Sequence, residues 1–344
     1  MTDSVKTTAS VDATEPVNAE QGEKDSSFLG MAGGYVKAAK EAIARKAHPL
    51  VEQYAQLFTH GARTPVLRTP DEVGLEYEDR WFPSADGVPL DAWFIPADSD
   101  RLLIVNHPMP CNRYGFPGHL APWNSMFGGF EVNFLPELKH LHDAGYNILT
   151  YDLRNHGRSG DGNGGLASIG LLESRDVAGS IDYALAQPDL ASMTTGLYSR
   201  CMGANSTIVA MRRWPEKFDH IRAAFFHQPA PGEALVRAAA THFKLDADNT
   251  AERVDERIFE LSGFRLAQLS PTPDAGAVKV PTMIAQLRRD WLMPNAAIEE
   301  IYDRLGTADK ELFWIEGSDQ RFSAYNYFGE HPEPLVGWFD RHML

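Results

Sequence analysis

Residues 196–204, Gly-Leu-Tyr-Ser-Arg-Cys-Met-Gly-Ala, constrain the possible folds of this chain more than any other stretch. An apolar run leads up to them, and a helical pattern begins directly after Cys201. A residue on a sharp strand-to-helix turn needs small neighbours two positions before and after it, so that the two backbones can pass. Ser199 and Gly203 occupy those positions. The segment therefore predicts a turn that presents the Cys201 thiol; the alternative is an ordinary turn with a buried cysteine.

The rest of the chain alternates strand-like and helix-like segments. Two stretches of alternating polarity, 75–82 and 88–95, predict an antiparallel pair of strands. After residue 101, short apolar runs typical of strands buried on both faces alternate with helical patterns. The expected strands are 102–105, 146–151, 193–198, 221–226, 281–287 and 311–315, and the expected helices are 131–144, 173–186, 202–218, 295–305 and 332–343. This order predicts an α/β fold with a mostly parallel, doubly wound sheet.

The sequence predicts three parts along the chain. Residues 1–27 are polar and are expected to form a disordered tail, and residues 28–73 are expected to form an N-terminal helical segment. Residues 74–344 are expected to form the α/β domain. The strand pattern lapses at about 229–278, which predicts a helical cap inserted into that domain.

Composition argues against several classes of function. The net charge of −15 argues against a nucleic-acid partner, for which a basic patch is expected. No apolar run reaches the roughly 18 residues of a membrane span, and the first residues lack the features of a signal peptide. The two cysteines, Cys111 and Cys201, cannot form a disulfide framework, which favours a reducing compartment. We therefore expect a cytoplasmic protein without metal or cofactor, and its oligomeric state stays open.

Four motifs in this order resemble the α/β-hydrolase family. The turn around Cys201 resembles its nucleophile elbow, with cysteine in the place of serine, as in dienelactone hydrolases. Residues 106–109, Asn-His-Pro-Met, resemble the oxyanion segment, and residues 151–160 resemble the loop after the following strand. Residues 289–294 resemble the turn that carries the acid. The resemblance implies the α/β-hydrolase fold for residues 75–344.

The resemblance also implies a covalent mechanism. Cys201 would attack a carbonyl carbon as a thiolate, stabilised by a base or by the start of the following helix. The backbone N–H groups of Met202 and Met109 would form the oxyanion hole, because Pro108 has no N–H group. Asp290 would orient the base, and its alternative role is the N-cap of the helix expected at 295–305.

The histidine expected after the acid is absent from its usual place. Gln320 stands there when the segment is aligned on Gly317 and Phe322, and glutamine cannot act as a general base. His331 is the leading replacement because it also follows the acid along the chain; its alternative is a surface position at the start of a helix. Other side chains expected to border the pocket are those of His107, Cys111, His156 and Gln320, with His227 as a further candidate base.

Two classes of function follow from these residues. The favoured one is an esterase-like or thioesterase-like enzyme, a hydrolase or acyl transferase that acts on an ester, thioester or lactone through Cys201. Its substrate would be a small molecule with an apolar or aromatic acyl group. The reason is that the oxyanion loop, residues 106–129, is rich in aromatic residues: Tyr114, Phe116, Trp123 and Phe127. The alternative is a protein of this fold without hydrolytic activity, such as a lyase, isomerase or ligand-binding accessory protein, because Gln320 replaces the histidine.

Overall fold

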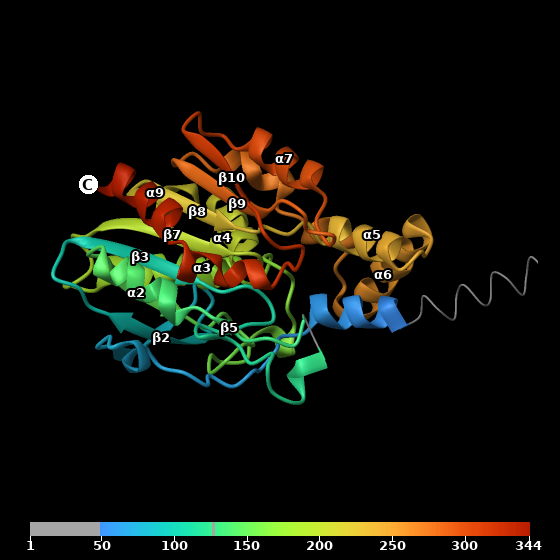
Figure 1. The fold of residues 1–344 in the computed structure, drawn as a ribbon, viewed down its shortest axis with the longest axis horizontal. Helices are drawn as coiled ribbons and strands as arrows, with labels where there is room; N and C mark the ends of the chain where they lie inside the picture. Colours follow the sequence, from blue (N-terminus) through green and yellow to red (C-terminus); the bar gives the residue numbers. More distant parts are fainter. Residues whose placement is uncertain (1–48, 126–127) are drawn as a thin grey trace, which may run out of the picture. The chain divides into compact units, whose positions relative to one another are not determined.

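A central eight-stranded sheet organises the described part of the chain, residues 49–125 and 128–344 of the computed structural model (Figure 1). Its strands run in the order β1-β2-β6-β3-β7-β8-β9-β10. Their bounds are β1 Glu78–Pro83, β2 Pro89–Ile95, β3 Arg101–Asn106, β6 Asn147–Tyr151, β7 Thr194–Arg200, β8 Ile221–His227, β9 Thr282–Leu287 and β10 Lys310–Ile315. β2 pairs antiparallel with β1 and β6, and the other neighbours pair parallel. The predicted mostly parallel sheet is confirmed.

The burial of each strand corresponds to its position in the sheet. β6 and β9 are buried at every residue, as the apolar runs in their sequences predict for strands covered on both faces. β1 lies at an edge and alternates in exposure, which fits its antiparallel pairing with β2. A separate two-stranded sheet joins β4, Gly115–Phe116, to β5, Val132–Asn133.

Helices cover both faces of the sheet. α2, α8 and α9 bury apolar residues on one face, and α3, α4 and α7 do so on the other (Figure 1). The α-helices are α2 Leu135–Asp143, α3 Ser174–Ala186, α4 Met202–Arg213, α5 Gly232–His242, α6 Ala247–Ser262, α7 Asn295–Arg304, α8 Tyr327–Glu330 and α9 Glu333–Met343. The 3₁₀ segments are η1 Pro70–Val73, η2 Trp123–Ser125, η3 Asn163–Gly165, η4 Pro215–Phe218, η5 Leu266–Leu269, η6 Thr272–Ala277 and η7 Ser323–Asn326. Residues 49–59 are also helical.

Two predicted helices differ from the observed ones. The helix expected at 131–144 begins at Leu135, because Val132–Asn133 pairs with β4. The helix expected at 202–218 ends at Arg213 and continues as η4. Pro215 explains the break, since the residue before a proline avoids helical angles and Trp214 has φ −137° and ψ 59°.

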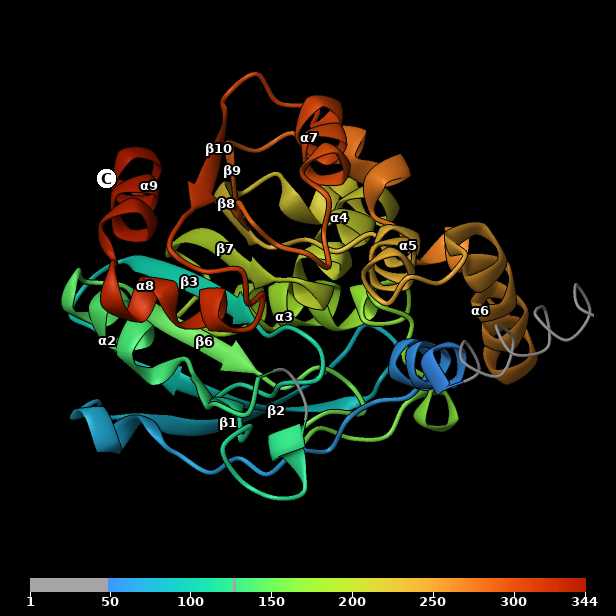
Figure 2. The ribbon, with the colours of Figure 1, turned by 45° about the vertical axis from the view of Figure 1, so that its right-hand side comes forward.

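The segment predicted as a cap contains helices. α5, α6, η5 and η6 follow β8 and precede β9. Figure 2 shows α5 and α6 beyond the end of the sheet at which β3 and β6 finish. The tail predicted at 1–27 lies outside the described residues, as do residues 28–48 of the predicted N-terminal helical segment. No helix within 49–125 and 128–344 has the length and apolarity that crossing a membrane requires.

Candidate active site

Cys201 occupies a strained turn between β7 and α4. Its backbone angles are φ 47° and ψ −108°, a region that residues other than glycine rarely adopt. Its amide donates a hydrogen bond to the carbonyl oxygen of His227 at 2.8 Å. A Cβ atom at Gly203 would lie 2.1 Å from Oδ1 of Asn106, at the end of β3. The small residue after the cysteine is therefore required by the close approach of β3 to α4.

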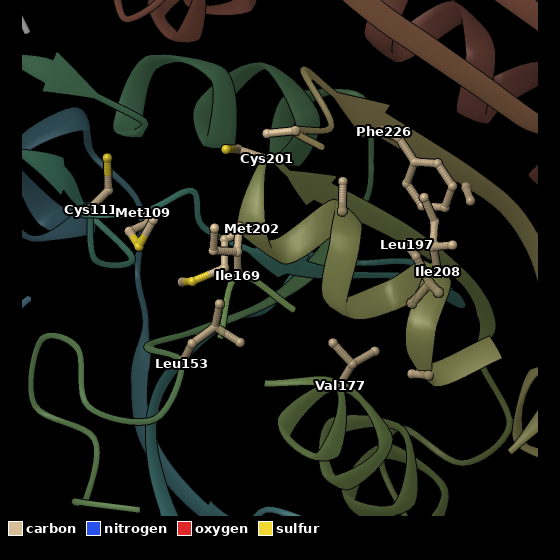
Figure 3. Packing of buried hydrophobic residues seen from close by; sticks show 14 of the residues in the cluster. Met109, Cys111, Leu153, Ile169, Val177, Leu197, Cys201, Met202, Ile208 and Phe226 are labelled. Carbon is tan, nitrogen blue, oxygen red and sulfur yellow. The ribbon is translucent and has the colours of Figure 1, made fainter. Parts of the chain in front are cut away.

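The oxyanion loop follows β3 and faces the start of α4. Figure 3 shows Met109 and Cys111 on this loop, beside Cys201 and Met202. Within the described residues, the amides of Met109 and Met202 donate no hydrogen bond to another part of the chain. Both N–H groups are therefore without a hydrogen-bond partner in this part of the chain.

Two buried histidines lie where this loop meets the loop after β6, with ring centroids 5.3 Å apart. Nε2 of His107 accepts a hydrogen bond from the amide of Leu153 at 2.9 Å, so its Nδ1 donates to the carbonyl oxygen of Pro108, also at 2.9 Å. Nδ1 of His156 lies 2.8 Å from the carbonyl oxygen of Arg154. Burial lowers the pKa of both rings, and that of His107 lies well below its ordinary value. Both are neutral rings in positions that fix the loops.

A buried ion pair joins the same two loops. Nη1 of Arg113 donates to Oδ2 of Asp152 at 2.7 Å, and the amide of Arg113 donates to Oδ1 at 2.7 Å. The amide of Arg158 donates to Oδ2 of Asp152 at 2.8 Å. Removing one partner of such a pair leaves an uncompensated charge in the core. The Asp152 carboxylate is therefore a structural group that positions the oxyanion loop.

Asp290 follows β9 and binds an arginine. Its Oδ2 accepts hydrogen bonds from Nη1 of Arg321 at 2.6 Å and from Nε2 of Gln286 at 3.0 Å. Its Oδ1 accepts from the amide of Leu292 at 3.0 Å. Pro294 is the N-cap residue of α7, so Asp290 does not have the capping role considered as its alternative.

Arg321 is tied to the same peptide segment as Cys201. Nη2 of Arg321 donates to the carbonyl oxygen of Gln228 at 2.6 Å, and Nε2 of Gln228 donates to the carbonyl oxygen of Arg321 at 3.0 Å. The preceding carbonyl, that of His227, accepts from the amide of Cys201. Two consecutive carbonyls therefore hold the elbow and the guanidinium. Burial alone would lower the pKa of Arg321, but its interactions with Tyr325, Asp290 and Cys201 raise that pKa above its ordinary value.

Two tyrosines border this charged group. The hydroxyl of Tyr325 is buried and lies close enough to Cys201 for a side-chain hydrogen bond between them to contribute to its pKa. Burial raises the pKa of Tyr325 well above its ordinary value, and negative charge on Cys201 raises it further. Tyr54, in the helix at 49–59, has a pKa raised to about 12, mainly by burial, with Arg321 and Asp290 among the charges that act on it. Both side chains are therefore protonated at neutral pH.

The remaining predicted site residues lie as follows. His331 is exposed, and its ring centroid lies 4.7 Å from that of Tyr327. Gln320 is exposed, and its backbone amide donates a hydrogen bond to Oγ of Ser318 at 3.0 Å. Cys111 is buried, and burial raises the pKa of its thiol well above the ordinary value, with the charge of Cys201 as a second cause. In the described chain, no histidine ring forms a hydrogen bond with Cys201 or Asp290.

The aromatic residues of the loop have different positions. Tyr114 is buried in the core, and its hydroxyl donates to Glu131 at 3.2 Å. Phe116 and Trp123 line a cavity of about 420 Å³, together with Pro110 of the oxyanion loop and residues from 53 to 64. Phe127 lies outside the described residues. Within the described part of the chain, no group of three or more His, Cys, Asp or Glu side chains is arranged to hold a metal ion.

Sequence comparison gives a distant relative. No protein-family model matches the sequence. The uncharacterized protein YqkD from Bacillus subtilis (strain 168) is 22% identical over 249 residues, which cover 70% of this chain and 72% of that protein.

Structure comparison defines the class of fold. The esterase Pf2001 from Pyrococcus furiosus aligns with a TM-score of 0.62 and 22% identity, covering 83% of this chain and 98% of that chain. The α/β hydrolase GrgF from Penicillium sp. sh18 aligns with a TM-score of 0.51 and 15% identity, covering 78% of this chain and 99% of that chain. The described chain has the α/β-hydrolase fold, as the motifs in the sequence predict.

Proposed function

We propose that this protein is an esterase-like enzyme that transfers acyl groups through Cys201. Its substrates would be esters, thioesters or lactones, and its products would be an acid or a new acyl compound. The single observation that carries the proposal is the position of Cys201 on a strained elbow at φ 47°, directly before the unengaged amide of Met202. Strain of about 1–3 kcal/mol at one residue is characteristic of functional sites.

The mechanism would have two steps. The thiolate of Cys201 attacks the carbonyl carbon, and the negative charge that develops on the oxygen is stabilised by the amides of Met202 and Met109. The bond to the leaving group then breaks, and an acyl–Cys201 thioester forms. Water or another nucleophile attacks this thioester in the second step and regenerates the thiolate. Asp290 would contribute indirectly, by orienting the base that activates the attacking nucleophile.

The acyl group is proposed to be apolar or aromatic. What supports this proposal is the apolar surface that Leu57, Phe116 and Trp123 contribute to a cavity next to Pro110; Cys201 is not part of the lining of that cavity. Its volume of about 420 Å³ is within the range of small-molecule sites.

The base for the second step is the open part of the mechanism. The position of His331 after the acid in the chain makes it a candidate, and this role stays a prediction without a supporting contact in the described chain. The alternative, a protein of this fold without hydrolytic activity, is favoured by one observation. The Asp290 carboxylate is engaged by Arg321, which cannot accept a proton.

Trapping of the acyl intermediate tests the proposal. The protein is mixed with p-nitrophenyl butyrate, quenched in acid within seconds, digested and mapped by mass spectrometry. We expect a butyryl group on Cys201 and none in Cys201→Ala. Cys111→Ala is the matched control, because Cys111 is the other cysteine in the chain, and it should acylate normally. Absence of a butyryl group from Cys201 in an otherwise folded protein would refute the nucleophile.

A further inference from the structure

The position beside the acid is occupied by a fixed positive charge. Arg321 is 4% exposed, and its guanidinium binds both the Asp290 carboxylate and the Gln228 carbonyl. Gln228 has φ 55°, so the peptide that holds the guanidinium is itself in a left-handed conformation. Backbone strain at Cys201 and at Gln228 is thus concentrated on the two segments that bring the thiol and the guanidinium together.

An arginine at this position changes the chemistry that the site can perform. Guanidinium donates hydrogen bonds, accepts none and does not lose its proton in proteins. It therefore cannot remove a proton from water or deliver one to an alkoxide. Its charge is available at every physiological pH, and a positive charge close to a cysteine favours the thiolate.

The groups around Cys201 are consistent with this role. The titratable or charged side chains near it are Arg321 and Tyr325, Cys111 on the oxyanion loop, and Asp290 and Tyr54 behind the guanidinium. The Asp290 charge is held directly by Arg321. Tyr54, Tyr325 and Cys111 are neutral at neutral pH, because burial raises the pKa of each. The positive charges near the elbow are those of Arg321 and of Arg200, the residue before Cys201; Arg321 is paired with Asp290, and Arg200 is paired with Glu137.

We infer that Arg321 is a positioning residue that stabilises the Cys201 thiolate in place of a histidine, and that the site accepts acyl donors whose leaving group departs as a stable anion. Thioesters and aryl esters are such donors, and alkyl esters are not. The inference rests on the proposed role of Cys201 as the nucleophile.

The reaction balances without a proton-transfer residue. The sulfur of Cys201 forms a bond to the acyl carbon, and the bond from that carbon to the donor sulfur breaks. The electron pair leaves with the donor as a thiolate, and the acyl group remains on Cys201. An acceptor thiolate reverses these steps, forming its own thioester and releasing the Cys201 thiolate. No proton moves in either half, so the fixed charge of Arg321 is sufficient for acyl exchange between thiols.

The first experiment measures the alkylation of Cys201 between pH 5 and pH 10. Iodoacetamide is used at limiting concentration, and the modified peptides are quantified by mass spectrometry. Arg321→Lys keeps a positive charge, whereas the double variant Asp290→Asn/Arg321→Gln removes the ion pair without leaving a buried charge. Arg288→Gln is the matched control, because Arg288 follows β9, as Asp290 does, but is paired with Glu316 at the surface. Thermal unfolding confirms that each variant is folded.

We expect the removal of the ion pair to slow the alkylation of Cys201 by a factor that depends on pH. At pH 7 the double variant should be alkylated about tenfold more slowly or worse, and the difference should disappear as the pH approaches 10. Arg321→Lys should stay within about fivefold of the parent, and Arg288→Gln should match it. Equal alkylation of Cys201 in all these proteins would overturn the role of Arg321 and leave the nucleophile in place. If Cys201 of the parent resists alkylation altogether, the proposed function itself fails.

The second experiment compares leaving groups with one acyl group. The parent is assayed with S-butyryl-N-acetylcysteamine and with ethyl butyrate, in the presence and absence of a thiol acceptor. We expect kcat/KM for the thioester to exceed that for the ethyl ester by about 100-fold or more, since a missing general acid costs about that factor. Butyryl transfer to the acceptor should exceed release of butyrate. Comparable turnover of the two donors would overturn the inference, because the ethyl ester requires protonation of its leaving group.

Discussion

Nη1 of Arg321 donates a hydrogen bond to Oδ2 of Asp290 at 2.6 Å, and both side chains are buried. The partner of the carboxylate that the sequence predicts as the acid is thus a permanent cation instead of an imidazole. The pair lies next to Cys201, because the carbonyls of residues 227 and 228 bind the Cys201 amide and the guanidinium.

Cys201 should be the reactive thiol of the protein. Burial raises the pKa of the Cys111 thiol well above its ordinary value, so Cys111 stays protonated and unreactive at neutral pH. With less than one equivalent of iodoacetamide at pH 7.5, peptide mapping should find carbamidomethyl groups on Cys201 before Cys111. Preferential labelling of Cys111 would count against Cys201 as the nucleophile.

Replacement of His331 by alanine should have little effect on turnover of a butyryl thioester. Its ring is exposed and lies against Tyr327, so the expected change in kcat/KM is within about threefold. The role predicted from chain order requires instead a loss of about two to four decades, which is the usual contribution of a positioned base. A loss of that size, with unchanged thermal stability, would support His331 as the base and contradict the assignment to Arg321.

The stability of the fold should decrease as the pH falls below about 6.5. Burial lowers the pKa of His107, His156 and His227 below the ordinary value, so the unfolded chain binds more protons than the folded one in this range. Each histidine contributes up to about 1.4 kcal/mol per pH unit below 6.5, and its contribution ends at its folded pKa. Urea unfolding at pH 8, 7, 6 and 5.5 measures this slope.

His227→Gln should reduce the dependence of the free energy of unfolding on pH. The variant removes one of the buried titrating groups while keeping a polar side chain near the hydroxyl of Tyr198, which lies 3.2 Å from Nδ1 of His227. The slope below pH 6.5 should fall by up to about 1.4 kcal/mol per pH unit. An unchanged slope would show that His227 has the same proton affinity in the folded and unfolded protein.

Gly203→Ala should damage both folding and activity. The added Cβ atom would lie 2.1 Å from Oδ1 of Asn106 and 3.0 Å from the carbonyl oxygen of His107. We expect a loss of about 1–3 kcal/mol in the free energy of unfolding, as for other overpacked sites. Acylation of Cys201 should also slow, because the oxyanion loop would be displaced.

A second change tests the cause of that loss. Asn106→Ala removes the nearer of the two clashing atoms, together with the contact between the Asn106 side-chain amide and the hydroxyl of Tyr151. Chemical denaturation of Gly203→Ala, with and without Asn106→Ala, should show partial recovery in the double variant. Additive losses in the double variant would contradict the clash as the cause.

The architecture could be predicted from the sequence because it depends on local patterns. Wholly apolar runs identified the strands buried on both faces, and the lapse of the strand pattern after β8 identified the helices α5 and α6. The small residue at 203 marked the elbow, since its need for space comes from the turn itself. The strands, the helices of the predicted cap and the elbow are each indicated by residues that lie close together in the sequence.

The composition of the site could not be predicted in the same way. Arg321 is the residue directly after Gln320, and alignment on Gly317 and Phe322 therefore directs attention to the wrong side chain. The contact of Arg321 with Asp290 spans 31 residues and its contact with Gln228 spans 93. No periodicity encodes such pairings. The positions of His107 and His156 near the site were expected, but their bonds to backbone groups of the two loops became visible only in three dimensions.

The peptide after β8 gives the site a mechanical property. The carbonyls of His227 and Gln228 lie in two consecutive peptide planes that meet at the Cα atom of Gln228, and they bind the Cys201 amide and the Arg321 guanidinium. The φ and ψ angles of Gln228 are therefore the backbone torsions between these two anchors, and its φ of 55° sets their relative orientation. A change of Gln228 out of the left-handed region would turn the elbow and the cation relative to one another.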